Sequence, residues 1–195
     1  ISMPVGNKGV TAGVSYLESM TRPGGDVSEL GLEANMKSAT ATVSYPVMYQ
    51  RDLALFTRAS VSWTDEVQQT NAGGVDEDIS HDRVTAARVG ASFNGCGLGC
   101  LGIDAEISKG LELGSRSNSQ VGNGTPLSRS TATSNFTHFR LNANYTVNPY
   151  EDFVLRLNGG GQYTLNNLLN SEQTSITGEQ RLSGFTSGSI SGDES

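Results

Sequence analysis

The sequence predicts an all-β chain that forms part of a transmembrane antiparallel β-barrel of the outer-membrane type. Apolar residues alternate with polar ones through several segments, and short connections between these segments alternate with long ones. A strand with lipid on one side and water on the other must change chemistry at every residue, which produces this period of two. The alternation gives about seven strands. An odd number does not match the even count of bacterial single-chain barrels, so we expect an incomplete barrel with unpaired edges.

Composition agrees with this fold class and argues against others. No apolar run approaches the length of a membrane-spanning helix. The 195 residues include 24 glycines and only 17% charged residues, which suits a β-protein with many turns. The net charge of -7 argues against a nucleic-acid partner, whose phosphates need a basic surface. Because the chain begins at Ile1 and ends at Ser195 within a motif, we expect an internal fragment of a longer polypeptide.

The strands are placed by the alternation alone. In chain order, they are expected at residues 8–19, 39–49, 53–64, 85–93, 101–108, 137–147 and 153–158. Residues 27–37 are predicted to form a long loop with some strand extension, and the acidic run 76–78 a solvated, disordered tip. Tyr45, Tyr49 and Trp63 lie near strand ends, where an interfacial aromatic girdle is expected.

The connections give the predicted barrel a direction. Short turns are expected at Gln50, Cys96 and Asn148, and long loops at Pro23, Gln68, Gly114 and Asn166. Outer-membrane barrels have short turns on the periplasmic side and long loops outside the cell. Residues 1–166 are therefore assigned to strands and loops of the wall, and residues 167–195 to a long loop on the extracellular side.

Two cysteines bracket one of the short turns. Cys96 and Cys100 are separated by Gly-Leu-Gly, so they can lie opposite each other at a hairpin base and form a disulfide in an oxidising compartment. Two thiols without a neighbouring histidine make a poor metal site. We therefore predict a possible disulfide and no metal.

Charged residues occupy the polar positions of several strands, which indicates a watery interior. The inward set is Arg58, Arg88, Asp104, Glu106, Arg140 and Arg156. One interpretation is that these charges pair with one another and hydrate the interior. The other is that they line a route for an unfolded polypeptide, which needs water and weak, exchangeable contacts. The sequence leaves both open.

No catalytic constellation is present. His81 and His138, the two histidines, have no serine or cysteine placed by a recognisable motif. The sequence therefore predicts neither an enzyme nor a cofactor.

The C-terminal stretch lacks alternation but carries a recognisable order of motifs. It contains Ser171-Glu-Gln, then Gly178, then Gly184-Phe185, and then Ser191-Gly192-Asp193. This order resembles that of the two-partner secretion transporters, the haemolysin activation/secretion branch of the Omp85 superfamily. Further similarity lies in Ser44-Tyr-Pro-Val, in 127–129, in 135–139 and in 161–169.

The resemblance implies a role for this loop. In the family it folds back into the barrel, and a Val-Arg-Gly-Phe/Tyr motif engages the inner wall. Here Ser183 occupies the arginine position, and Arg181 lies two positions earlier. The loop residues expected to take part are Gly178, Arg181, Ser183, Gly184, Phe185, Gly192 and Asp193.

The resemblance also implies a function and its setting. It implies a barrel in the outer membrane of a Gram-negative bacterium, in contact with lipid, that secretes a large partner exoprotein such as a haemolysin or adhesin and can also activate it. POTRA domains upstream and more strands downstream are implied. Two alternatives remain open at this point: an Omp85-type factor that assembles outer-membrane proteins, and a soluble β-sandwich adhesin or lectin.

Overall fold

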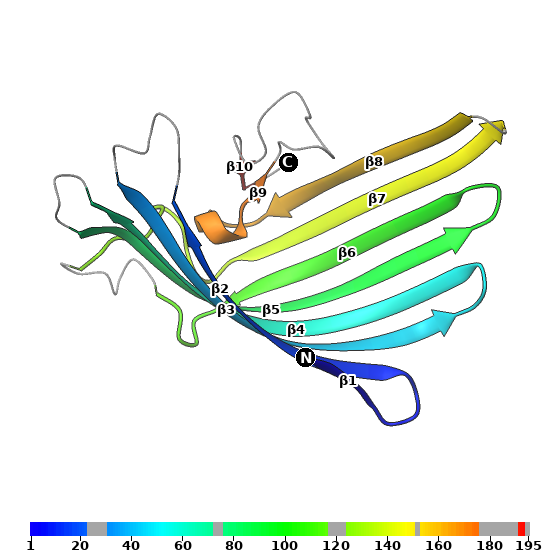
Figure 1. Ribbon diagram of the computed structural model, residues 1–195, viewed down its shortest axis with the longest axis horizontal. Coiled ribbons are helices and arrows are strands. Elements are labelled where there is room, and N and C mark those ends of the chain that lie inside the picture. The colour runs from blue at the N-terminus through cyan, green and yellow to red at the C-terminus, as the bar shows by residue number, and fades with distance from the viewer. Residues whose placement is uncertain (23–30, 72–75, 117–123, 151–152, 176–190, 194–195) are drawn as a thin grey trace.

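The computed structural model describes residues 1–22, 31–71, 76–116, 124–150, 153–175 and 191–193. Eight strands form one curved antiparallel sheet in which each strand pairs with the next along the chain (Figure 1). They are β1 (Ser2–Val5), β2 (Val10–Thr21), β3 (Leu32–Tyr49), β4 (Leu53–Thr70), β5 (Glu77–Cys96), β6 (Cys100–Leu111), β7 (Thr137–Tyr150) and β8 (Phe153–Thr164). A short 3₁₀-helix, η2 (Asn170–Glu172), and a two-stranded sheet of β9 (Thr174–Ser175) and β10 (Ser191–Gly192) follow. No helix among the described residues is long and apolar enough to cross a membrane.

The predicted fold class is confirmed, and the large sheet has one more strand than the alternation gave. The sheet is open, with β1 and β8 as its outermost strands, and this fits an incomplete barrel. Strand β1 was missed because four residues that include a proline are too short to show a period of two. It pairs with β2 through a turn in which Gly6 and Gly9 have φ values of 72° and 75°, a backbone region that favours glycine.

Strands β3, β4 and β5 extend further toward the long loops than predicted. Leu32 pairs with Thr70, and Thr70 in turn pairs with Glu77, so part of the predicted loop 27–37 and of the acidic tip 76–78 is strand. The alternation disappears here because both faces of a strand are wet once it leaves the membrane. Without a lipid face, hydropathy no longer reports strand structure.

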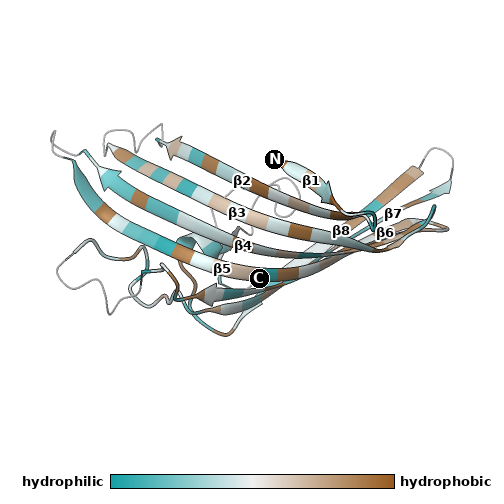
Figure 2. Cartoon of the chain, turned by 90° about the horizontal axis from the view of Figure 1, so that it is seen from below, coloured by the Kyte–Doolittle hydropathy of each residue, from teal (hydrophilic) through white to brown (hydrophobic). Residues whose placement is uncertain are grey.

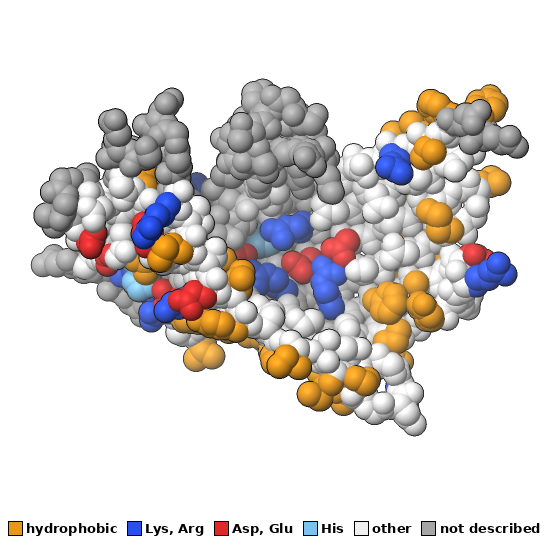
Figure 3. All heavy atoms as spheres, in the orientation of Figure 1, with side chains coloured by type: hydrophobic (Ala, Val, Ile, Leu, Met, Phe, Trp, Pro, Cys, Tyr) orange, Lys and Arg blue, Asp and Glu red, His pale blue; other side chains and the backbone are white. Residues whose placement is uncertain are grey.

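Hydrophobic and hydrophilic residues follow one another along the strands (Figure 2), and because successive side chains point to opposite faces, the two faces of the sheet differ in chemistry. One row across the outer face runs Val43, Ala59, Val89, Ile107, Phe139 and Tyr163 from β3 to β8. The large side chains of this row are 40–62% exposed, as a lipid-facing belt must be. Charged side chains gather instead in the hollow of the sheet (Figure 3). The predicted inward and outward sets are therefore separated as alternation requires.

A β-bulge removes Tyr49 from the outward-facing aromatic girdle in which it was expected. The pairing of β3 with β4 shifts between Pro46 and Met48, so Tyr49 lies opposite Ala54. The extra residue reverses the alternation beyond the bulge, because side chains change face at every residue. The Tyr49 ring packs edge-on against Phe56, with centroids 6.0 Å apart, and is not in the outward girdle predicted for it.

The apolar core lies inside the hollow, at the end where the long loops emerge. Its members are Val84, Ala86, Leu127, Ala132, Phe136, Leu168 and Leu169. They come from β5, from the connection between β6 and β7, and from residues 165–175, which we call the returning segment. Gly110 allows the approach, because a Cβ there would lie 2.0 Å from the Ser134 carbonyl oxygen. Two loop segments therefore fold back over the inner face.

Candidate functional site

The candidate site is the inner wall of the sheet together with the chain that folds onto it. One row across the wall reads Arg58, Gly90, Glu106, Arg140 and Gln162, one residue from each of β4 to β8. With Asp104, these residues form what we call the inner-wall network. Its charges alternate in sign along the row, so neighbouring side chains attract one another.

Arg58 makes the strongest contacts of this network. Its guanidinium donates to Asp104 Oδ2 at 2.6 Å, to Asp104 Oδ1 at 2.9 Å and to Glu106 Oε2 at 3.1 Å. This forked geometry is the one that arginine offers to carboxylates. Gly90 lies between them on β5, and a Cβ there would lie 3.0 Å from Arg58 Cζ and 2.9 Å from the Ala105 carbonyl oxygen. Because Gly90 has no side chain, the Arg58 side chain has room to reach across β5 to the carboxylates on β6.

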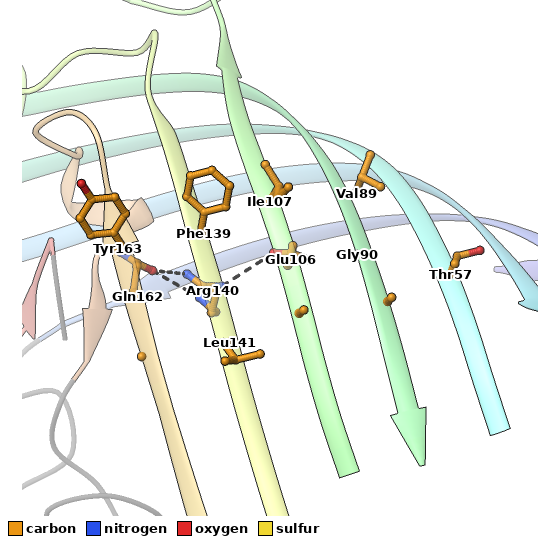
Figure 4. Close-up of a pocket in the computed structure, with 13 residues that line it drawn as sticks. Thr57, Val89, Gly90, Glu106, Ile107, Phe139, Arg140, Leu141, Gln162 and Tyr163 are labelled. Carbon is orange, nitrogen blue, oxygen red and sulfur yellow. Dashed lines mark hydrogen bonds and ion pairs between the residues drawn. The ribbon is translucent and has the colours of Figure 1, made fainter. Parts of the chain in front are cut away.

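Arg140 continues the network toward the free edge of β8. It lies 4.0 Å from Glu106 and donates to Gln162 Oε1 at 2.9 Å from Nη2. Figure 4 shows these contacts as dashed lines, beside the outer row that includes Phe139 and Tyr163. Strands β6, β7 and β8 therefore carry both an apolar outer row and a hydrogen-bonded inner row.

Gln162 also joins the wall to the returning segment. It is 3% exposed, and its Nε2 donates to the carbonyl oxygens of Glu172 at 3.4 Å and Asp193 at 3.0 Å. Its Oε1 also accepts a hydrogen bond from the hydroxyl of Thr174. The buried amide of Gln162 thus contacts β7, η2, β9 and the residue that follows β10.

An ion pair fixes η2 to the wall. Arg88 Nη2 lies 2.5 Å from Glu172 Oε1, and the two side chains are 18% and 7% exposed. Arg88 also donates to the hydroxyl of Ser62. Glu172 is the acid of the Ser-Glu-Gln motif, so this contact gives the motif a place in the hollow.

Asp193 makes a second attachment. Its Oδ1 accepts hydrogen bonds from Arg129 Nη1 at 2.5 Å and from Gln173 Nε2 at 2.9 Å. Burial opposes ionisation of this carboxyl group, but the hydrogen bonds from Arg129 and Gln173 outweigh it and hold the pKa of Asp193 below its usual value. The carboxylate is therefore the form that the attachment requires.

The structure brings together five of the six predicted inward charges in two clusters. Arg58, Asp104, Glu106 and Arg140 share the inner-wall network, and Arg88 contacts the returning segment. Arg156 lies opposite Thr146 near the short-turn end and has no ion pair among the described residues. Of the predicted loop residues, Gly192 and Asp193 are described, and the others lie outside the described residues: Gly178, Arg181, Ser183, Gly184 and Phe185.

Several residues of the site were not identified from the sequence, among them Gln162, Glu172 and Arg129. Gln162 and Glu172 lie in stretches that carried the family resemblance, but no charge pattern marked them as contacts. Arg129 lies in a loop without alternation, so its direction was not predictable. The motifs themselves were the available signal, because a polar residue in a recognisable motif is a candidate contact.

The cysteine turn lies at the opposite end of the sheet. Cys96 and Cys100 pair at the end of the β5–β6 hairpin and are joined by a disulfide. Among the residues that the structure describes, no group of three potential ligands is placed to hold a metal ion.

Together, the lipid-facing outer row, the charged hollow and the returning segment define a wall of an outer-membrane β-barrel with a loop folded inside. The whole chain, residues 1–195, matches the model of the haemolysin secretion/activation protein family ShlB/FhaC/HecB. The chain therefore belongs to this family of two-partner secretion transporters. No curated protein matches it.

Two solved structures share this fold. CdiB from Escherichia coli superposes with a TM-score of 0.68 at 16% sequence identity, over 95% of this chain and 33% of that one. CdiB from Acinetobacter baumannii gives a TM-score of 0.69 at 17% identity, over 95% of this chain and 32% of that one. The chain spans about a third of the length of the structures it matches.

Proposed function

We propose that this chain forms part of the barrel of a two-partner secretion transporter in the outer membrane of a Gram-negative bacterium. It exports a large partner exoprotein, such as a haemolysin or an adhesin. Residues 1–166 serve as wall and connecting loops, and residues 167–195 as the loop inside the hollow. The observation that carries the proposal is the returning segment, whose Ser-Glu-Gln motif is fixed to the inner wall through Arg88 and Glu172.

The chemistry of the hollow suits passage of an unfolded chain. The charges of the inner-wall network are paired with one another, so they keep water in the hollow and offer a passing peptide no strong binding site among themselves. Weak and exchangeable contacts allow movement, whereas tight binding would stop it. The returning segment occupies part of this space, so export requires it to move.

The open edge of β8 supports the proposal that more strands complete the barrel. Unpaired backbone groups cost several kcal/mol each in lipid, so a membrane-embedded edge needs a partner. Additional strands of the same protein, with periplasmic POTRA domains, would supply the closed wall and the entry path. A soluble β-sandwich would need a second sheet over the outer apolar row, and the described residues place none there.

Secretion from a Gram-negative host tests the proposal. The gene for the candidate exoprotein is expressed with and without the full-length transporter gene, and the exoprotein is measured in the medium and in the periplasm. We expect the exoprotein in the medium only when both are present. Retention in the periplasm, or recovery of the transporter outside the outer-membrane fraction, would contradict the proposal.

Acidification should loosen the attachment at Asp193. Because its pKa is held low in the folded protein, the attachment is fully present above the ordinary aspartate value of about 3.9 and is lost as pH falls through the lower value. We expect the conductance of the purified full-length transporter in planar bilayers to rise as the pH falls below the ordinary aspartate value of about 3.9. Asp193→Asn removes this titration, so an unchanged acid response in that variant would assign the effect to another group.

A further inference from the structure

A pair of buried polar residues lies beneath the folded-back loops, in a part of the hollow that would otherwise be wet. Ser108 on β6 and His138 on β7 are neighbours in one cross-strand row and are both 0% exposed. Ser108 Oγ and both ring nitrogens of His138 have no hydrogen-bond partner among the described residues. We call these two residues the polar floor.

The cover over the polar floor is apolar. Phe136 stacks on the His138 ring, with centroids 5.4 Å apart and planes 4° from parallel. Phe136 belongs to the same buried cluster as Leu168 and Leu169 of the returning segment, which are 0% exposed. Ser171 adds a third buried hydroxyl without a partner in the described part of the chain. Covering the floor therefore removes water from these polar atoms, and the described residues return no hydrogen bond to them.

Two opposing effects act on the returning segment. The Arg88–Glu172 ion pair, a hydrogen bond of 2.8 Å from Arg129 to the Leu168 carbonyl oxygen and one of 3.1 Å from the Thr133 amide to that of Asn167 hold it in place. Desolvation of the polar floor opposes them, because buried donors and acceptors without partners favour a hydrated state. An inner wall selected only for stability would carry apolar residues at these two positions.

We infer that the returning segment is a releasable cover, and that rehydration of Ser108 and His138 favours its release. The inference rests on the proposed function only for the statement that this cover lies in the path of transport. Release exposes Leu169 to water, whereas the covered state hides it. The population of the released state is therefore measurable without any transport.

Thiol labelling of the full-length protein in vesicles measures this population. In a Leu169→Cys variant, a membrane-impermeant maleimide reacts only from the released state. His138→Leu and Ser108→Ala each remove polar atoms that have no hydrogen-bond partner in the described part of the chain, so each is expected to slow labelling by about fivefold or more. Thr42→Ala removes an inner-wall hydroxyl on β3 outside this cluster and should leave the rate unchanged. Heat-modifiable migration on gels checks that each variant barrel is folded.

Unchanged or faster labelling in the folded variants would overturn the inference, because it would mean that these polar atoms stabilise the covered state. Ser108→Ala, the smaller change, decides the matter if His138→Leu does not fold. Failure of secretion combined with slowed labelling would reject the proposed function and leave the releasable cover standing.

Discussion

Replacing Glu172 with alanine is expected to detach the returning segment from the wall and to raise the conductance of the transporter strongly. Arg88 is 18% exposed and would be left without its carboxylate partner, which lies 2.5 Å away. Removing one member of a buried ion pair costs about 3–5 kcal/mol, because the remaining charge stays desolvated. The loss destabilises the folded-back position of η2 and not the eight-stranded sheet, because Glu172 lies outside that sheet. Single-channel recordings of the full-length protein in planar bilayers measure the result.

A matched control separates this effect from a general loss of charge. Glu33 pairs with Arg22 at 2.7 Å, but the two side chains are 21% and 69% exposed, so Glu33→Ala removes a surface ion pair. Such pairs contribute little to stability, because water screens the two charges. We expect Glu33→Ala to leave the conductance unchanged. The double variant Arg88→Glu with Glu172→Arg, which exchanges the two charges, should recover part of the low conductance of the wild type. Equal conductance in the Glu172→Ala and Glu33→Ala variants would refute the attachment.

Alternation determined how much of the wall was predictable. Lipid and water impose opposite chemistry on the two faces, so the alternation predicts opposite sides for Arg58 and Val89, and the register of β4 with β5 places them in different cross-strand rows. The same rule failed where its cause was absent. Beyond the membrane both faces are wet, so the outer parts of β3 to β5 showed no period. At Pro46 the bulge reversed the period, which exchanged the face of Tyr49.

Which charged residues pair with each other in the hollow was less predictable than which face of the sheet each residue occupies. Alternation places Arg58, Arg88, Asp104 and Glu106 in the interior, but which charges meet depends on the register between strands. The register aligns Arg58 with Gly90 and Glu106, and only the absent side chain at Gly90 lets the arginine cross β5. The contacts of Glu172 depend on a loop that has no period at all, so its motif was recognisable but its partner was not.

Replacing Arg58 with leucine is expected to make the pore strongly selective for cations and to destabilise the barrel. Asp104 and Glu106 lie two residues apart on the same face of β6, and both take hydrogen bonds from Arg58. Without the arginine, the two carboxylates repel each other. Among the described residues, the other cation within ion-pair distance of either carboxylate is Arg140, 4.0 Å from Glu106. Because Asp104 is 39% exposed, water reduces the loss of stability to about 1–3 kcal/mol. Reversal potentials in a salt gradient and thermal unfolding measure the two effects.

Three companion variants test whether pairing, and not net charge, causes this change. Arg156→Gln removes the same unit charge from an exposed position without an ion pair among the described residues, so its shift in selectivity should be much smaller. Arg58→Lys keeps the charge but loses the forked hydrogen bonds, so an intermediate result is expected. Gly90→Val keeps every charge and obstructs the crossing, since even a Cβ would lie 3.0 Å from Arg58 Cζ. If Gly90→Val were to behave as the wild type, the bridge across β5 would not be what holds the two carboxylates in the wall.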